Sequence, residues 1–330
     1  MNQSISRLIK IVLFIFVIVA TDKALGLVLR KLYFNQMAGQ DFSINYTLSK
    51  CNADVMIFGN SRAQHHYDSR IISAGLKISC YNAGLEGGHS ILLPDAEIKV
   101  ITERYSPRII ILEFSPTGIV HFDGDYDRLS VLLPYYKDYP AIRSFLQLRG
   151  PYEKIKLMSS IYPFNSDIIN IIGFNTKTQA ARRQDFEGYI PLNEVLNPEI
   201  IKIKPQYVSQ SIMRTKSILD TNMVNALENI ISICKEKKIA LYIINSPVYH
   251  TVNEIQTPAY AVAKISLDII HRNHVDFLDF SDSPAFVGHP ELFADEGHLN
   301  EKGAKIFSNM VINSLLSFQE FKLLLVKSWR

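Results

Sequence analysis

The stretch Asp54-Val55-Met56-Ile57-Phe58-Gly59-Asn60-Ser61-Arg62 combines the pattern of a buried strand with a sharp turn. Its apolar run stops at Gly59, Ser61 follows two residues later, and residues 63–72 contain neither glycine nor proline, so they are expected to start a helix. A strand that turns directly into a helix presents its first side chains at the open edge of a sheet, where backbone N–H groups are also free. The stretch therefore predicts a strand–turn–helix unit in which Ser61 has the position of a nucleophile.

The alternation of apolar strands and helical segments continues on both sides of a long middle region. Residues 108–114, with the sequence Arg-Ile-Ile-Ile-Leu-Glu-Phe, form a strongly apolar, β-branched strand. Continuous apolar strands joined by helices indicate a parallel sheet covered on both faces. We therefore predict an α/β fold with a doubly wound, five-stranded parallel sheet, which binds ligands beyond the carboxyl ends of its strands. The expected strands are 54–58, 78–81, 108–114, 240–245 and 275–280, and the expected helices are 63–74, 91–105, 213–238, 261–272 and 301–318.

The middle region, about residues 121–212, loses this rhythm and is rich in Tyr, Pro, Asn and Asp. Short helices are expected near residues 141–148 and 154–161. A connection of this length is unusual inside a compact domain and indicates a functional segment or a subdomain. We interpret it as an irregular insertion or lid over the end of the sheet rather than an independent domain. The predicted layout is a membrane segment over residues 1–34, a polar linker over residues 35–50, and a sheet domain over residues 51–330 that contains the insertion.

The composition is that of a mostly globular chain. The 330 residues are 47% hydrophobic, enough for a sizeable core, and the formal net charge of +3 gives no argument for a nucleic-acid partner. The three cysteines, Cys51, Cys80 and Cys234, are too few for a disulfide framework. Cys51 and Cys80 can pair outside the cytoplasm, and the alternative is that all three are buried thiols.

The N-terminus carries a long apolar segment. Arg7 and Lys10 precede an uncharged run from Ile11 to Thr21, Asp22-Lys23 interrupts it, and apolar sequence continues to Leu29. The uninterrupted run has the length of a secretory signal, whereas the whole segment has the length of about 20 residues that a spanning helix needs.

Three interpretations of this segment stay open: an uncleaved anchor, a signal cleaved at the weak site Ala24-Leu25-Gly26, and an ordinary amphipathic helix. Basic residues at the start favour a cytoplasmic N-terminus, although Arg30-Lys31 weaken the asymmetry. We expect a single uncleaved anchor with the sheet domain outside the cytoplasm, in the periplasm or at the cell surface.

A candidate base lies on the loop before the last helix. Asp295 precedes His298 by three residues, so its carboxylate can turn onto the imidazole, fix the tautomer and stabilise the imidazolium. Ser61 leaves the carboxyl end of the first strand and the Asp295–His298 loop leaves that of the fifth, so both project over one sheet edge. The chain order Ser, Asp, His then predicts acyl transfer, in which His298 takes the Ser61 proton and Ser61 attacks an ester carbonyl.

An oxyanion formed in this reaction needs hydrogen-bond donors. The Ser61 backbone N–H is one candidate, and the Gly84 N–H at the end of the second strand is another. The side-chain amide of Asn82 is a third. Each feature also has an ordinary explanation, since Gly, Asn and Ser are common turn residues and Asp295 can merely cap a turn.

These motifs resemble the sequence blocks of the SGNH (GDSL-like) hydrolase superfamily. The first block corresponds to Gly59-Asn60-Ser61, the second to Asn82-Ala83-Gly84, and the last to Asp295-Glu296-Gly297-His298-Leu299-Asn300 with Gly303. The resemblance covers about residues 54–116 and 213–318 and implies a flavodoxin-like sheet of the SGNH type. Together with the N-terminal segment, it is similar to membrane-tethered branches that include O-acetyl esterases and acetyltransferases of cell-surface polysaccharides.

The chain departs from the family pattern at two places. Asn60 stands where the family usually has Asp, and the third strand ends Leu112-Glu113-Phe114-Ser115-Pro116 without the family's oxyanion Asn. Ser115 or Asn82 is expected to substitute, or the oxyanion hole is weaker, and Asn245 at the end of the fourth strand is a more remote candidate.

Two further residues are candidates for substrate binding. Arg62, at the start of the helix, can bind a carboxylate or an anionic sugar, and His89 follows Gly88 and can line a pocket. An ordinary salt bridge is an equally good explanation of Arg62. The remaining histidines have no metal-site spacing, so we expect no metal and no organic cofactor.

The expected function is that of a serine esterase acting on acyl esters, in particular O-acetyl esters of cell-surface carbohydrate. An O-acyltransferase shares the acyl-enzyme and differs only in the acceptor. A non-catalytic module that binds polysaccharide or partner proteins of the cell envelope is the alternative from another class, and a lipid-active esterase is a third possibility.

Overall fold

The computed structural model describes residues 3–37, 39–122, 124–176, 187–199, 219–250 and 260–318. The chain forms two compact units. The sheet unit comprises Tyr46–Arg128 and Asp185–Arg330, and the small unit comprises Met1–Asn45 and Leu129–Gln184. The grouping of residues 129–184 with the N-terminal segment differs from the predicted insertion or lid, which assigned these residues to the sheet domain.

The sheet unit contains five parallel strands, as the sequence predicted, and their order is β2-β1-β3-β4-β5. The side chains of β1, β2 and β3 are all buried, which explains the continuous apolar sequences of β1 and of β3 up to Leu112. β5 lies at the edge and keeps partly exposed side chains. The strands span Val55–Phe58 (β1), Cys80–Asn82 (β2), Ile109–Glu113 (β3), Ala240–Asn245 (β4) and Asp276–Asp279 (β5).

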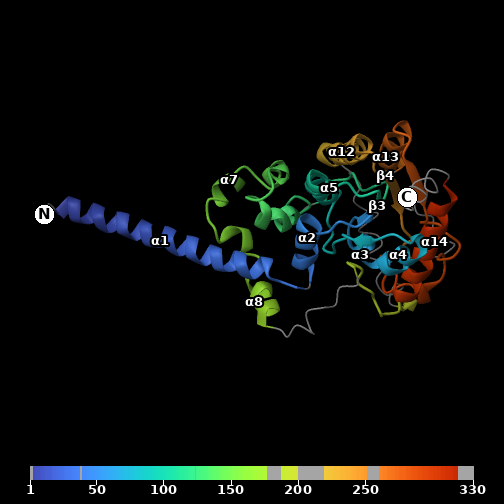
Figure 1. The fold of residues 1–330 in the computed structure, drawn as a ribbon, viewed down its shortest axis with the longest axis horizontal. Coiled ribbons are helices and arrows are strands. Elements are labelled where there is room, and N and C mark those ends of the chain that lie inside the picture. The colour runs from blue at the N-terminus through green and yellow to red at the C-terminus, as the bar shows by residue number, and fades with distance from the viewer. Residues whose placement is uncertain are drawn as a thin grey trace. The chain divides into compact units, whose positions relative to one another are not determined.

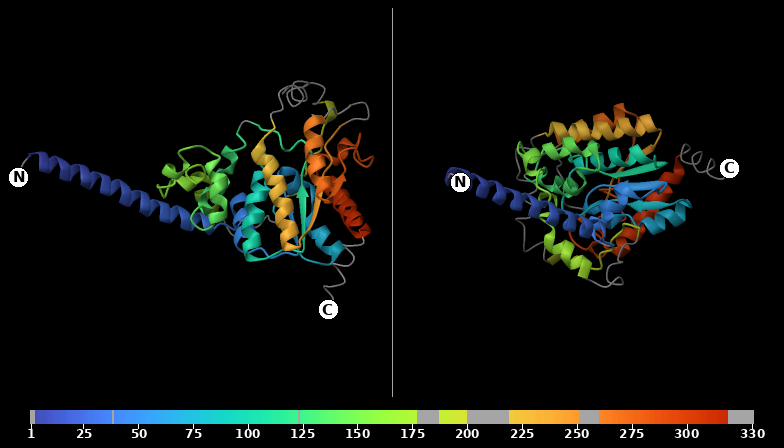
Figure 2. Two further views of the ribbon diagram at one scale, coloured as in Figure 1. Left: turned by 90° about the horizontal axis from the view of Figure 1, so that it is seen from above. Right: turned by 60° about the vertical axis from the view of Figure 1, so that its left-hand side comes forward.

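Helices cover both faces of this sheet (Figures 1 and 2). One face carries α3, α4 and α14, whose mutual contacts place the N- and C-terminal parts of the unit side by side. The other face carries α5, α12 and α13. The helices span Ser61–His66 (α3), Ser69–Leu76 (α4), Leu92–Arg104 (α5), Thr221–Lys237 (α12), Tyr260–Arg272 (α13) and Glu301–Ser317 (α14).

Two predicted helices of the sheet unit differ from the observed ones by more than one residue at an end. The helix expected over residues 63–74 is divided into α3 and α4, because Asp68 adopts an extended conformation and caps α4 by accepting the Arg70 N–H. Asp220 caps α12 in the same way, so this helix begins at Thr221. The earlier part of the predicted 213–238 helix lies mostly outside the described residues.

The small unit consists of one long helix and several short ones. α1 spans Gln3–Phe34, and its last turns contribute Tyr33, whose ring is buried between Tyr135 and Phe164 at centroid distances of 6.0 and 5.5 Å. The short helices are η1 (Asp127–Tyr135), η2 (Pro140–Ile142), α6 (Arg143–Gln147), α7 (Glu153–Lys156), η3 (Tyr162–Phe164) and α8 (Ile168–Thr176). By length and composition α1 fits a membrane-spanning helix or a signal sequence.

The linker predicted over residues 35–50 is wrong for most of its length. Residues Gln40–Ser49 form the helix α2, in which Ile44 and Leu48 are almost fully buried one turn apart. The three cysteines are buried free thiols rather than a disulfide pair with one remainder. The Cys51 thiol lies 3.4 Å from the Met56 sulfur.

Candidate active site

The turn after β1 brings two strands and a helix unusually close together. Gly59 has φ 151°, and a Cβ at this position would lie 2.8 Å from the Glu113 Cβ and 2.9 Å from the Ala63 Cβ. Only glycine therefore allows the chain to pass between β3 and α3. β1 and β3 are neighbours at the point where the strand order reverses, which is where doubly wound sheets bind their ligands.

The start of α3 places Ser61 at this point. Asn60 is the N-cap, and its side-chain oxygen accepts the Arg62 N–H at 3.0 Å. Asn60, which departs from the family pattern, thus still performs a local capping role. Ser61 is the first helical residue, so its own N–H has no partner within the helix.

A hairpin-like loop presents Asp295 and His298. Phe293 and Leu299 pair in an antiparallel bridge, and the Ala294 N–H donates to the His298 carbonyl at 2.8 Å. Asn300 then caps α14 by accepting the Gly303 N–H at 3.1 Å. The Leu-Asn pair after the histidine therefore holds the end of the loop against the helix.

The structure brings the three predicted side chains into one hydrogen-bonded chain. Ser61 Oγ lies 2.7 Å from His298 Nε2, and His298 Nδ1 lies 2.9 Å from both carboxylate oxygens of Asp295. Because the carboxylate only accepts, the Nδ1 atom carries the proton and Nε2 accepts from the serine hydroxyl. This is the arrangement of a nucleophile, a base and a residue that orients the base.

Asp295 is held in its charged form. Partial burial alone would raise the pKa of its carboxyl, but the hydrogen bond and charge of His298 and the Gly297 N–H outweigh this, so the pKa is lower than usual. The carboxylate also accepts the Gly297 N–H at 2.8 Å, which fixes its orientation. It therefore stays ionised through neutral and mildly acidic pH.

A second histidine, His66, supports the loop that carries Asp295 and His298; from the sequence it was one of the histidines without metal-site spacing, expected to be packed or to face solvent. His66 is fully buried, its Nε2 atom accepts the Leu299 N–H at 3.0 Å, and its Nδ1 atom contacts Ser246 Oγ at 2.8 Å. His66 therefore links Leu299, the residue after His298, to Ser246 at the end of β4 through hydrogen bonds. Burial and the positive charge of Arg62 hold the pKa of His66 well below its usual value.

This network predicts that His66 makes the fold sensitive to acid. The unfolded chain takes up a proton at His66 near pH 6.5, whereas the folded chain keeps it neutral, so stability falls as the pH drops below about 6.5. We expect His66→Gln to show a smaller fall in Tm than the wild type between about pH 7.5 and about pH 5.5. Thermal unfolding followed by circular dichroism at each pH measures this difference. Parallel curves for the two proteins would contradict it.

Arg62 is held by protein groups rather than left open for a substrate. Its guanidinium forms an ion pair with Glu113 at 2.9 Å and donates to Asn245 Oδ1 at 3.3 Å, and its side chain is only 14% exposed. Glu113 is fully buried and also accepts the Tyr67 hydroxyl at 2.5 Å. The explanation as a salt bridge therefore fits Arg62 better than the predicted binding of an anionic sugar.

The predicted oxyanion role of Asn82 is wrong, because its polar atoms are used within the fold. Its side-chain nitrogen donates to the carbonyls of Ala63 and Tyr67 at 2.7 and 2.9 Å, and its oxygen accepts the Gly84 N–H at 2.9 Å. The Gly84 N–H is thereby engaged as well. Gly84 is instead required for packing, since a Cβ there would lie 2.5 Å from the Gln64 nitrogen.

The same loop contains other amides. The Glu86 N–H donates to Gln64 Oε1 at 3.2 Å, which fastens the loop to α3. In the described part of the chain, no hydrogen bond uses the N–H of Gly87, whose φ of 108° favours glycine. At the end of β3, Ser115 contacts Thr117 Oγ1 at 3.1 Å, and Asn245 donates to Asp279 at 2.9 Å.

His89 lies in the loop after β2, close to Gly87. Its Nε2 atom is 3.5 Å from the position that a Gly87 Cβ would take. Burial and the charge of Arg128 lower the pKa of His89 to about 4, so it is neutral at physiological pH. Among the described residues no hydrogen bond joins it to Ser61 or His298, and its predicted role in substrate binding stays a prediction.

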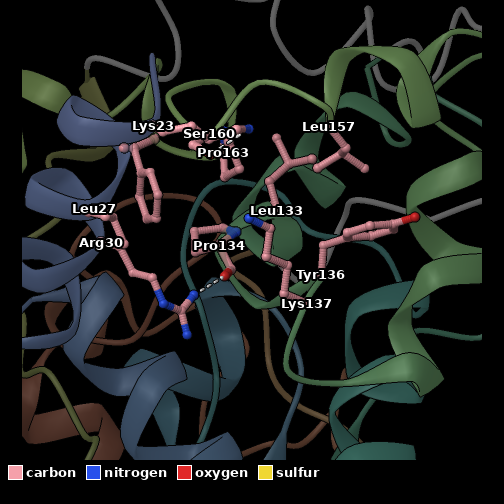
Figure 3. A pocket seen from close by; sticks show the side chains of 12 residues that line it. Lys23, Leu27, Arg30, Leu133, Pro134, Tyr136, Lys137, Leu157, Ser160 and Pro163 are labelled. Carbon is pink, nitrogen blue, oxygen red and sulfur yellow. Dashed lines mark hydrogen bonds between the residues drawn. The ribbon is translucent and has the colours of Figure 1, made fainter. Parts of the chain in front are cut away.

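A pocket of about 180 Å³ belongs to the small unit and contains none of the three residues (Figure 3). It is lined by Lys23, Leu27 and Arg30 from α1 and by Leu133, Pro134 and Lys137 from the segment around η1.

Among the residues that the structure describes, no group of three His, Cys, Asp or Glu side chains is arranged to hold a metal ion. No protein-family model and no curated protein matches the chain.

Proposed function

We propose that the protein is a serine esterase that cleaves acyl esters through an acyl-enzyme on Ser61. The observation that carries the proposal is the continuous hydrogen-bonded chain from Ser61 Oγ through His298 to Asp295, with distances of 2.7 and 2.9 Å. A merely structural serine and histidine have no need of a carboxylate aligned on the far ring nitrogen. The resemblance to SGNH hydrolases, which rests on the same residues, points to the same chemistry.

The reaction follows from the hydrogen-bond pattern. His298 Nε2 removes the proton from Ser61 as Oγ forms a bond to the ester carbonyl carbon, and Asp295 stabilises the resulting imidazolium. The imidazolium gives its proton to the leaving alcohol as the carbon–oxygen bond breaks. Water, activated in turn by His298, then releases the acyl group and restores Ser61.

The oxyanion of this reaction is expected to bind backbone amides. The Ser61 N–H is available because it is the first of its helix. With Asn82 and the Gly84 N–H engaged, the next amide of the same loop, that of Gly87, is the second donor we propose.

The substrate class follows from the resemblance and from α1. Membrane-tethered SGNH-like proteins include enzymes for acetylated surface polysaccharides, so we propose an O-acetyl ester of cell-surface carbohydrate as the substrate. An acyltransferase uses the same acyl-enzyme with a sugar hydroxyl in place of water.

We further propose that α1 is an uncleaved anchor and that the sheet unit acts outside the cytoplasm. The support comes from the last third of α1, which is built into the small unit: Asp22 and Lys23 are bonded to residues 158–161, and Tyr33 is buried. Cleavage at Gly26 would remove Asp22 and Lys23 from these contacts. An uncleaved helix keeps the unit intact.

Labelling with a fluorophosphonate probe tests the proposed activity. The full-length protein in detergent is expected to be labelled and to hydrolyse an activated acetyl ester, because Ser61 is activated by His298. Ser61→Ala should lose both, whereas Ser317→Ala, which changes an exposed serine at the end of α14, should retain both. Equal labelling of the wild type and Ser61→Ala, or no labelling of either, would rule out the esterase.

A further inference from the structure

The two parts of α1 have different surroundings. Over its first part the large apolar side chains are exposed, with Leu8 62%, Val12 59% and Phe16 67% accessible. From Asp22 onward one side of the helix is packed against the rest of the small unit, and Gly26 and Tyr33 are buried. Leu25, Leu27 and Val28 on its other side stay 50%, 69% and 55% accessible.

The loop after α7 is hydrogen-bonded to α1 at Asp22 and Lys23, where this packing begins. Asp22 accepts the Ser160 N–H at 2.8 Å and the Ser159 hydroxyl at 2.5 Å, and Lys23 donates to the Met158 carbonyl at 2.8 Å. Gly26 makes the close approach possible, since a Cβ there would lie 2.3 Å from the Ser160 Cβ. Residues 158–161 therefore lie at the same height along α1 as Asp22 and Lys23.

This loop and α7 expose a group of large apolar side chains. Tyr152 is 66% accessible, Ile155 65% and Met158 74%, while Glu153 and Leu157 between them are buried. The lysines on either side of Ile155, Lys154 and Lys156, are exposed as well. An aromatic ring, aliphatic side chains and lysines in one short segment form the composition of a surface that lies in the lipid head-group region.

The position of α1 in a bilayer decides where this segment lies. A hydrocarbon core of about 30 Å takes about 20 helical residues. With Arg7 at one interface, about 20 residues of α1 end near Leu27 at the other, and Arg30-Lys31 follow outside it. Met158, bonded to Lys23, then lies about 6 Å to the hydrocarbon side of this end, within reach of the boundary between hydrocarbon and head groups.

We propose that residues 152–158 insert into the head-group layer of the bilayer that α1 crosses, so that the small unit is a membrane-bound collar around the end of the anchor. Ile155 and Met158 enter the boundary of the hydrocarbon, and Lys154 meets lipid phosphates, whereas the Lys156 ammonium is paired with Glu153 at 2.7 Å. The nearby pocket has matching chemistry, because Leu157 lines it together with the cations Lys23, Arg30 and Lys137 (Figure 3). The proposal depends on α1 spanning the membrane and is independent of the proposed esterase activity.

Fluorescence quenching in nanodiscs tests this proposal with the full-length chain. The variants Ile155→Cys and Met158→Cys, each with one added cysteine, carry an environment-sensitive dye, and spin labels on the lipid acyl chains near the head groups act as quenchers. The native cysteines are buried, and the labelled wild type gives the background. Quenching at both sites is expected to exceed by at least about twofold that at Lys31→Cys, which lies about 12 Å further along α1 from Lys23.

Phe14→Cys, in the exposed apolar part of α1, is the control for a residue within the bilayer. Quenching at residues 155 and 158 no stronger than at Lys31→Cys would overturn the proposal. A blue-shifted but unquenched dye would also overturn it, since a protein partner and not lipid would then cover the segment. Absence of quenching at Phe14→Cys would remove its premise, without bearing on the labelling of Ser61.

Discussion

Replacement of His298 by alanine is expected to lower kcat for an acetyl ester by a factor of about 10⁴ or more. The imidazole is the only group hydrogen-bonded to Ser61 Oγ in the described structure, at 2.7 Å, so without it the hydroxyl keeps its proton. The main effect should fall on kcat, because the base acts in the transition state rather than in binding. Steady-state kinetics on the purified full-length protein, with the enzyme concentration set by quantitative amino-acid analysis, measure it.

The double variant Ser61→Ala/His298→Ala separates a cooperating pair from two independent effects. Residues that act as one unit give grossly non-additive losses, so the double variant should be about as inactive as either single one. His289→Ala is the matched control, because this exposed histidine contacts only Glu291 among the described residues, at 3.0 Å. A loss of less than about tenfold in His298→Ala would contradict the proposed role of the base.

Glu113→Ala is expected to destabilise the sheet unit by about 3–5 kcal/mol, which is the range for removing one partner of a buried ion pair. The carboxylate is fully buried and joins three elements: it pairs with Arg62 on α3, accepts the Tyr67 hydroxyl, and accepts the Ser246 N–H at 3.4 Å. Its loss leaves the mostly buried guanidinium without a counter-charge. Thermal unfolding should show a fall in Tm on the order of 10 °C.

Two further variants show whether charge or packing is responsible. Glu113→Gln keeps an acceptor for Tyr67 but removes the charge, so we expect an intermediate loss. The pair Arg62→Met/Glu113→Leu replaces the buried ions with apolar side chains and should recover much of the stability lost in Glu113→Ala. A Glu113→Ala protein within about 1 kcal/mol of the wild type would show that the ion pair is not important to the fold.

The sheet was predictable because its signals are local and strong. β1 is apolar at every position and β3 at every position before Glu113, as expected of strands buried on both faces, and β4 was predicted with its observed bounds. The helix α2 was missed because Ile44 and Leu48 are its only two almost fully buried apolar residues, too few to show a helical period among polar neighbours. The small unit was missed because its core joins Tyr33 to residues about 100 positions later, which no local pattern records.

The residues of the candidate site also fall into two groups: some have local sequence signals, and others depend on contacts between distant parts of the chain. Ser61 and the Asp295–His298 loop were predictable, because the spacing within each loop and the shared sheet edge fix their meeting point. The contact of His66 with Ser246 joins residues 180 positions apart, and it depends on how α3 packs at the end of β4. The hydrogen bond from the Gly84 N–H to Asn82 Oδ1 could have been predicted, since an Asn side chain commonly accepts the backbone N–H two residues later.

The separation of the two halves of the small unit also sets an order of events during synthesis. Tyr33 and Asp22 leave the ribosome long before their partners Tyr135, Ser160 and Phe164, and the strands β1 to β3 are made in between. Asp22 and Tyr33, near the end of α1, therefore lack their full set of partners until residue 164 has been translated. Synthesis of the first part of the sheet unit therefore precedes closure of the small unit, and a chain stalled before residue 129 would carry α1 to α5 and β1 to β3 but no closed small unit.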